Sequence, residues 1–137
     1  MEIEAFETEL SSILDNSRSA DNATRVNAIP ELGRFIDRYS ARERLEEIMV
    51  NDEIVTMRVD AAEQLARHGG ESGLLAVLNE LGRRSADPDV DYTAYMLSEL
   101  ENFDEFPVLS KALSIDQKLM SPEAKLGLQH LRELMQK

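Results

Sequence analysis

The stretch MRVDAAEQLARHGG, at residues 57–70, recurs in altered form at nearly constant spacing along the chain. With Leu65 taken as its anchor, the pattern returns around Leu32, Leu100 and Leu131, so that consecutive anchors are 33, 35 and 31 residues apart. Intervals of this size are typical of stacked helical repeats. We therefore expect a chain built from four similar units.

Apolar side chains around each anchor follow the spacing of one helix face. The positions four and three residues before the anchors are apolar or small: Ala28 and Ile29, Ala61 and Ala62, Met96 and Leu97, Gly127 and Leu128. Three residues after the anchors stand Phe35, His68, Phe103 and Leu134, which complete the predicted buried stripe. Thirteen residues after the first three anchors stand Leu45, Leu78 and Leu113. Each unit is therefore predicted to be a pair of helices.

The run from Met57 to Leu65 resembles the second helix of a HEAT-like repeat, in which an acidic turn precedes the pattern V-R-x-x-A-x-x-x-L. Asn51-Asp52 supplies that turn, and the run from Thr24 to Leu32 is similar. Asp87-Pro88-Asp89-Val90 keeps the turn, but the third and fourth copies have Thr93 and Ala124 at the arginine position. The resemblance implies an all-α fold, a short α-α superhelix that binds a partner along one face. It implies no particular activity, because these are motifs of the fold.

The patterns predict eight helices in four antiparallel pairs, within a single domain over residues 1–137. The expected helices cover about 2–14, 22–39, 41–50, 52–68, 71–84, from 87, 105–114 and from 122. Pro30 should bend the second helix, and Gly69-Gly70 should end the fourth, which Asn51 or Asp52 can cap. Asp87-Pro88 and Ser121-Pro122 should each open a helix as N-cap and N1 proline. No stretch alternates with period two over the length of a strand, so no sheet is expected.

Buried positions can be assigned within these helices from the same periodicity. In the first helix they are Ile3, Phe6, Leu10, Ile13 and Leu14. In the third and fifth helices they are Leu45, Ile48 and Met49, and then Leu74, Leu75, Leu78 and Leu81.

Composition restricts the classes of partner. With 27 acidic and 15 basic residues, the formal net charge is −12, which disfavours nucleic acid and favours a basic protein. The chain lacks cysteine, its first residues are acidic where a signal peptide would be basic, and it lacks a long apolar run. We therefore expect a cytoplasmic protein without a membrane partner. We also expect it to be a monomer or a weak homodimer.

The residues that could perform catalysis are few. His68 occupies a core slot of the repeat and His130 precedes an anchor, and neither belongs to a zinc or di-iron motif. Asp87, Asp89 and Asp91 match the first acids of a calcium loop, but Tyr92 and Ser98 replace its glycine and its final glutamate. Gly70-Glu71-Ser72-Gly73 lacks the last glycine of a nucleophile elbow, and no lysine follows these glycines to hold a phosphate. The sequence therefore predicts that the protein is not an enzyme, binds no cofactor and has no metal site.

One segment differs from the rest in charge. Residues 85–110 contain seven acids and no lysine or arginine, together with four of the seven phenylalanine and tyrosine residues. In the repeat register, the positions −8, −5, −1 and +2 from each anchor form a second stripe beside the core. In the third repeat these positions are Tyr92, Tyr95, Glu99 and Asn102, where the other repeats have no tyrosine.

Tyrosines backed by carboxylates, on the face that HEAT-like solenoids usually make concave, resemble an interface for a basic partner. The predicted partner-binding residues are Asp91, Tyr92, Tyr95, Glu99 and Asn102, with Asp60 and Gln64 from the second repeat. The alternative is that the two tyrosines pack against a neighbouring repeat and that the acids only solvate the surface.

Three classes of function remain open. A small acidic helical repeat is similar to bacterial immunity proteins that bind and neutralise toxins, many of which are basic nucleases, and this class is favoured. The second class is a protein–protein adaptor or chaperone-like module. The third is an enzyme, related to helical-repeat DNA glycosylases or to pigment-attaching lyases. It ranks last because the surface charge has the wrong sign for DNA and because no acid–base pair is apparent.

Overall fold

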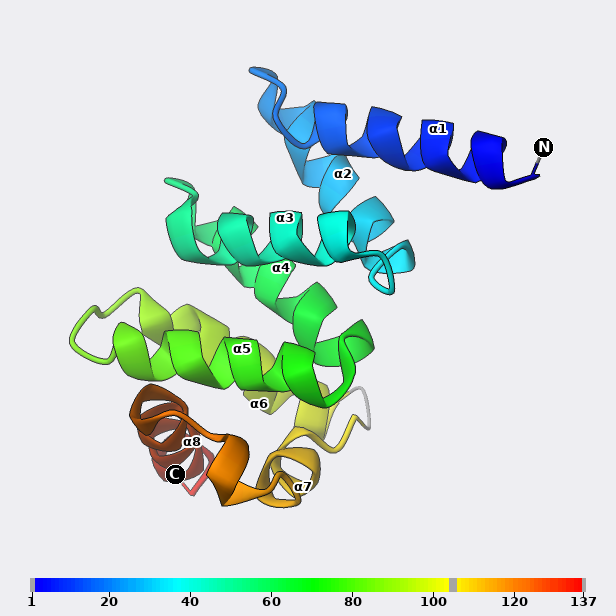
Figure 1. Cartoon of the computed structure of the whole chain (residues 1–137). Helices are drawn as coiled ribbons and strands as arrows, with labels where there is room; N and C mark the ends of the chain where they lie inside the picture. Colours follow the sequence, from blue (N-terminus) through cyan, green and yellow to red (C-terminus); the bar gives the residue numbers. More distant parts are fainter. Residues whose placement is uncertain (1, 104–105, 137) are drawn as a thin grey trace. The chain divides into compact units, whose positions relative to one another are not determined.

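The computed structural model describes residues 2–103 and 106–136, and within these ranges the chain is all-helical and contains no strand. The elements are α1 (Glu2–Asn16), α2 (Asn22–Arg34), α3 (Tyr39–Asn51), α4 (Val55–His68), α5 (Gly70–Arg83), α6 (Val90–Asn102), α7 (Val108–Leu113), the 3-10 helix η1 (Gln117–Leu119) and α8 (Pro122–Met135) (Figure 1). The all-α prediction is confirmed. The pairing of the helices and the superhelix stay predictions.

Most helix ends agree with the chemistry of the sequence. Asp21 accepts a hydrogen bond from the Thr24 backbone N–H at 3.0 Å and caps α2, which continues through Pro30 without interruption. The stop between α4 and α5 lies at the two glycines, where Gly70 adopts φ 65°, a conformation that glycine tolerates. α8 begins with Ser121 as N-cap and Pro122 at its first position, as predicted.

Three boundaries differ from the predicted ones. The second helix was expected to reach residue 39, but α2 ends at Arg34 and a turn follows. Pro88 does not open α6, because the side chain of Asp87 accepts from the Asp89 N–H at 2.9 Å and forms a turn, so that the helix begins two residues later than this proline. α7 has only six residues, and the predicted start at Glu105 lies outside the described residues.

The chain divides into two compact units, Met1–Gln64 and Leu65–Lys137. In the N-terminal unit, α1, α2 and α3 pack against one another. Its core contains Leu10, Ile13, Ile29, Leu32, Phe35, Leu45, Ile48 and Met49. The single domain over residues 1–137 stays a prediction.

Two burial predictions for α1 are wrong. Phe6 was expected in the core but is exposed, because it covers only one side of the buried Phe35, with ring centroids 4.5 Å apart. The Arg38 guanidinium lies 5.2 Å from the centroid of the Phe6 ring on the surface of the unit. Leu14 is half-buried, and the side chain of Ile3 lies outside the described residues.

The turn after α1 is held by a contact that the sequence did not indicate. Arg44 of α3 donates from Nε to the Ser17 hydroxyl and from Nη2 to the Ser17 carbonyl oxygen, both at 2.9 Å. Burial, and then the nearby charge of Arg18, lower the pKa of Arg44. Nearby, Arg25 of α2 forms an ion pair with Asp52, which also accepts from the Ile54 N–H at the start of α4. These bonds fix the ends of α1 and α4 within this unit.

In the C-terminal unit, α5 packs most extensively against α8, while α6 contacts both α7 and α8. The core includes Leu74, Val77, Leu78 and Leu81 of α5, Leu97 and Leu100 of α6, and Leu131 of α8. Leu75 was expected to be buried but is half-buried. α5 and α8 come together at two glycines. A Cβ atom at Gly127 would collide with the Leu78 carbonyl oxygen, and one at Gly82 would collide with that of Glu123.

The repeat register describes the core correctly at the anchors and fails toward the helix ends. Leu32, Leu65, Leu100 and Leu131 are all buried. Of the four positions three residues after the anchors, Phe35 alone is buried. His68, the last residue of α4, and Phe103, which follows α6, are exposed, and Leu134 is half-buried. Leu113 is also exposed, because the short α7 ends at that residue.

Candidate functional site

α6 has one buried face and one face that carries aromatic and polar side chains. Val90, Thr93, Ala94, Met96, Leu97 and Leu100 are buried. On the other face lie the residues that we call the α6 surface: Tyr92, Tyr95, Glu99, Asn102 and Phe103. The steps of three and four residues from Tyr92 to Asn102 place those four side chains on one side of the helix, and Phe103 follows directly after its end.

The aromatic side chains of the α6 surface are open to solvent. Tyr92 is 59% exposed, Tyr95 is 51% exposed and Phe103 is 79% exposed. Buried packing would hide most of a tyrosine ring, so these two rings are not covered by packing within the C-terminal unit. Phe103 was predicted to lie in the core, and the structure instead adds it to this surface.

Asp91, also predicted to bind the partner, has a role inside the C-terminal unit. Its Oδ1 lies 3.0 Å from Nε2 of His130 on α8. An ionised carboxylate only accepts hydrogen bonds, so the imidazole is the donor in this contact. Both side chains are partly exposed. The pair therefore joins α6 to α8 at the edge of the α6 surface.

Asp60 and Gln64, the predicted binding residues of the second repeat, lie on α4 in the N-terminal unit, and both are half-buried. The end of the Gln64 side chain lies against Gly33 of α2, where it fills the space beside the glycine. Burial, and to a smaller extent the charge of Glu63, raise the pKa of Asp60. Within their own unit, these two side chains are less available to a partner than Tyr92 and Tyr95 are in theirs.

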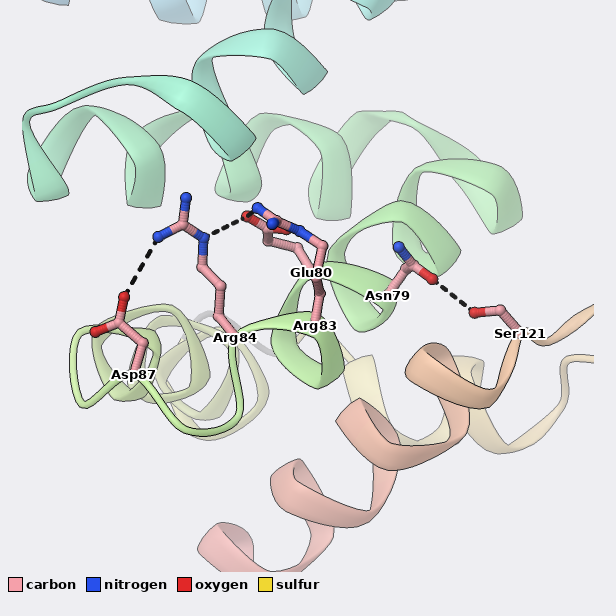
Figure 2. A network of polar contacts seen from close by, with 6 residues as sticks. All are labelled: Asn79, Glu80, Arg83, Arg84, Asp87 and Ser121. Carbon is pink, nitrogen blue, oxygen red and sulfur yellow. Dashed lines mark hydrogen bonds and ion pairs between the residues drawn. The ribbon is translucent and has the colours of Figure 1, made fainter.

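The sequence patterns did not identify a buried carboxylate near the end of α5. Glu80 is 5% exposed. Its carboxylate accepts hydrogen bonds from Arg83 at 2.6 and 3.0 Å and from Arg84 at 2.8 Å (Figure 2). Arg84 also donates a hydrogen bond to Asp87 at 3.3 Å. The hydrogen bond to Glu80 raises the pKa of Arg83. The spacing of three and four residues is a readable signal for such pairs. Both oxygens of Glu80 are occupied, so the network is structural.

Beside this network, Ser121 connects the start of α8 to α5. Its hydroxyl donates to Oδ1 of Asn79 at 2.6 Å and accepts from the Ala124 N–H at 3.0 Å (Figure 2). Because both the cap and the contact between helices disappear together, Ser121→Ala is expected to lower the free energy of unfolding by about 1–2 kcal/mol. Urea unfolding followed by circular dichroism measures this loss. A variant as stable as the wild type would show that the hydroxyl contributes nothing at this junction.

The carboxylates and histidines of the described residues do not gather into a metal-binding cluster. No group of three or more histidine, aspartate or glutamate side chains among them is placed to hold a metal ion. Within the calcium-like segment, Asp87 is engaged by Arg84 and Asp91 by His130.

A cavity of about 230 Å³ beside the start of α5 is lined by Arg67, Glu71, Phe106 and Lys111 among others, but by neither histidine. The Lys111 ammonium lies 5.5 Å from the centroid of the Phe106 ring.

None of the helices in the described residues is long and apolar enough to cross a membrane. Comparison with known protein families, with curated proteins and with solved structures found no match.

Proposed function

We propose that this chain is a non-catalytic, HEAT-like protein-binding module that binds and neutralises a basic toxin domain, such as a nuclease, in the manner of an immunity protein. The observation that carries the proposal is the α6 surface, where two half-exposed tyrosines and an exposed phenylalanine lie beside Glu99 in a segment without a basic residue. The proposed protein is cytoplasmic and acts as a monomer or weak homodimer.

The side chains of the α6 surface suit a protein interface. Tyrosine offers a large contact area with few rotatable bonds, and it is enriched among the residues that dominate binding energy. Tyr92 and Tyr95 are one helical turn apart, and Phe103 extends the aromatic area beyond the end of α6. Glu99 and Asn102 add polar groups that can fix the orientation of the partner.

The charge of the segment selects the kind of partner. Residues 85–110 contribute seven of the net twelve negative charges. Such a surface attracts a basic protein and accelerates its association, whereas it repels nucleic acid. The substrate groove of a nuclease is basic because it binds phosphates. An acidic surface that covers such a groove would block the substrate directly.

The proposal is tested by capture from the lysate of the source organism. The wild-type protein is compared with Tyr95→Ala/Glu99→Lys, which removes an aromatic group and reverses one charge four residues apart. The expected result is a basic protein that is retained by the wild type and lost by the variant. The purified partner should also lose its toxic activity when the wild-type protein is added in equimolar amount.

A matched control lies on α3. Tyr39 is 77% exposed, and Glu43 follows it at the same spacing. Tyr39→Ala/Glu43→Lys therefore makes the same chemical change on a different helix, and it should retain the partner. If both variants lose the partner equally, overall charge and not this surface governs binding.

The adaptor alternative predicts a different result from the same experiment. A partner that depends on the α6 surface but has no toxic activity to inhibit would identify an adaptor or chaperone-like module. Failure to capture any basic protein, or capture that is equal for the wild type and the α6 variant, would overturn the proposed site.

A further inference from the structure

The C-terminal unit contains a groove whose charge is opposite to that of the α6 surface. The groove has a volume of about 410 Å³ and lies along α8, with Gln117 of η1 at its side. Lys125, Gln129, Arg132 and Gln136 line it at steps of four, three and four residues, which places them on one face of α8. Met120 and Leu128 supply its apolar part.

The cations of this groove have no counterion in the described part of the chain. Among the described residues, Lys125 and Arg132 form no ion pair. The carboxylate in the groove, Glu133, accepts from the Gln129 amide at 3.2 Å. The chain carries twelve excess negative charges, yet this groove combines two cations that form no ion pair with apolar lining residues. Such a surface suits an acidic helix.

α1 supplies a helix of that chemistry. It contains five acidic residues and no basic one. A shallow hollow along α1 is lined by Glu4, Glu7, Thr8, Ser11, Ser12 and Asp15. Arg38 pairs with Glu7, but Glu4 and Asp15 form no ion pair among the described residues. The unpaired charges of this face are therefore opposite to those of the groove.

The two faces also match in length and in side-chain type. The stripe on α1 runs from residue 4 to residue 15 and the stripe on α8 from residue 125 to residue 136, so each spans about 16 Å at about 1.5 Å per residue. The hydroxyl groups on α1 are small and can donate to or accept from the glutamine amides of the groove. Small side chains also allow a second helix to approach closely.

We propose that the α8 groove binds α1 of a second copy of this chain. Because the two faces are different surfaces, the contact is heterologous, and its repetition gives open head-to-tail chains unless they close into a ring. One helix face in a groove buries less than the roughly 1,200 Å² of a stable interface, so the association should be weak, with Kd on the order of 0.1 mM. It should also weaken as salt screens the exposed charges.

Charge exchange tests this proposal with the full chain. One variant reverses the groove, Lys125→Glu/Arg132→Glu, and the other reverses α1, Glu4→Lys/Asp15→Lys. In sedimentation velocity at low salt, the weight-average mass of the wild type should rise roughly fivefold between about 10 µM and about 1 mM, and each variant alone should stay monomeric. An equimolar mixture of the two variants should associate again, because each groove then meets an α1 of opposite charge.

Two controls keep the result specific. Arg18→Glu/Lys111→Glu changes the net charge by the same amount as the groove variant does, but at residues outside both faces. It should associate like the wild type. The α6 variant Tyr95→Ala/Glu99→Lys should do so as well, which separates this contact from the proposed partner surface. Circular dichroism confirms that each variant is folded. A wild type that stays monomeric, variants that associate unchanged, or a mixture that does not associate would each overturn the proposal.

Discussion

Leu65→Ala is expected to lower the free energy of unfolding by about 2–5 kcal/mol, the usual cost of truncating a fully buried leucine. Leu65 has 0% of its surface exposed, and its side chain is the anchor of the stretch that defines the repeat. Removing it leaves a cavity that the neighbouring helices can fill only in part. Urea unfolding followed by circular dichroism measures the change, and Leu100→Ala, at 2% exposed, should behave in the same way.

Exposed leucines provide the comparison. Leu113 is 53% exposed and Leu126 is 44% exposed, so replacing either by alanine should change stability by about 0.5 kcal/mol or less. Leu113 is especially informative because it occupies the same register position as the buried Leu45 and Leu78. If Leu65→Ala were no more costly than Leu113→Ala, the anchor would not mark the core.

The repeat period predicted the core of the helices well. Burial at Leu32, Leu65, Leu100 and Leu131 follows from a spacing that places one apolar side chain per unit on the inner face. The same reasoning found most of the helices and the cap at Ser121, because local sequence determines both periodicity and capping.

Several of the errors lie where a helix ends. A periodic pattern assumes that the helix continues, so it placed Phe103 in the core although α6 ends at Asn102. The side chain of Asp87 forms a turn of its own, which moved the start of α6 past Pro88. Short-range polar contacts of this kind compete with the helix and are not visible in hydrophobic periodicity.

The candidate site was predictable in part. The repeat register placed Tyr92, Tyr95, Glu99 and Asn102 on one side of α6, and the structure leaves all four exposed. It could not show that Asp91 would bond to His130, which is 39 residues away in sequence. It also could not show that Gln64 would lie against Gly33. Such contacts depend on tertiary packing and have no local signal.

The close approach of α5 and α8 was also beyond the sequence pattern, and it leads to the second large expected effect. Gly127→Ala should destabilise the protein by about 2–3 kcal/mol. The added Cβ would collide with the Leu78 carbonyl oxygen and would lie 3.0 Å from the Gly82 nitrogen. These are backbone atoms of α5, so relief requires the two helices to move apart. The midpoint and slope of urea unfolding report the loss.

Gly33→Ala is the matched control, because it makes the same substitution within a helix but meets a different neighbour. The three atoms nearest to a Cβ added at Gly33 all belong to the Gln64 side chain, whose flexible end can move. Alanine favours a helix over glycine by up to about 1 kcal/mol, so this variant should be as stable as the wild type or more stable. A loss at Gly127 with no loss at Gly33 would assign the cost to backbone contact between α5 and α8. Equal stability of the two variants would mean that these helices can separate at little cost.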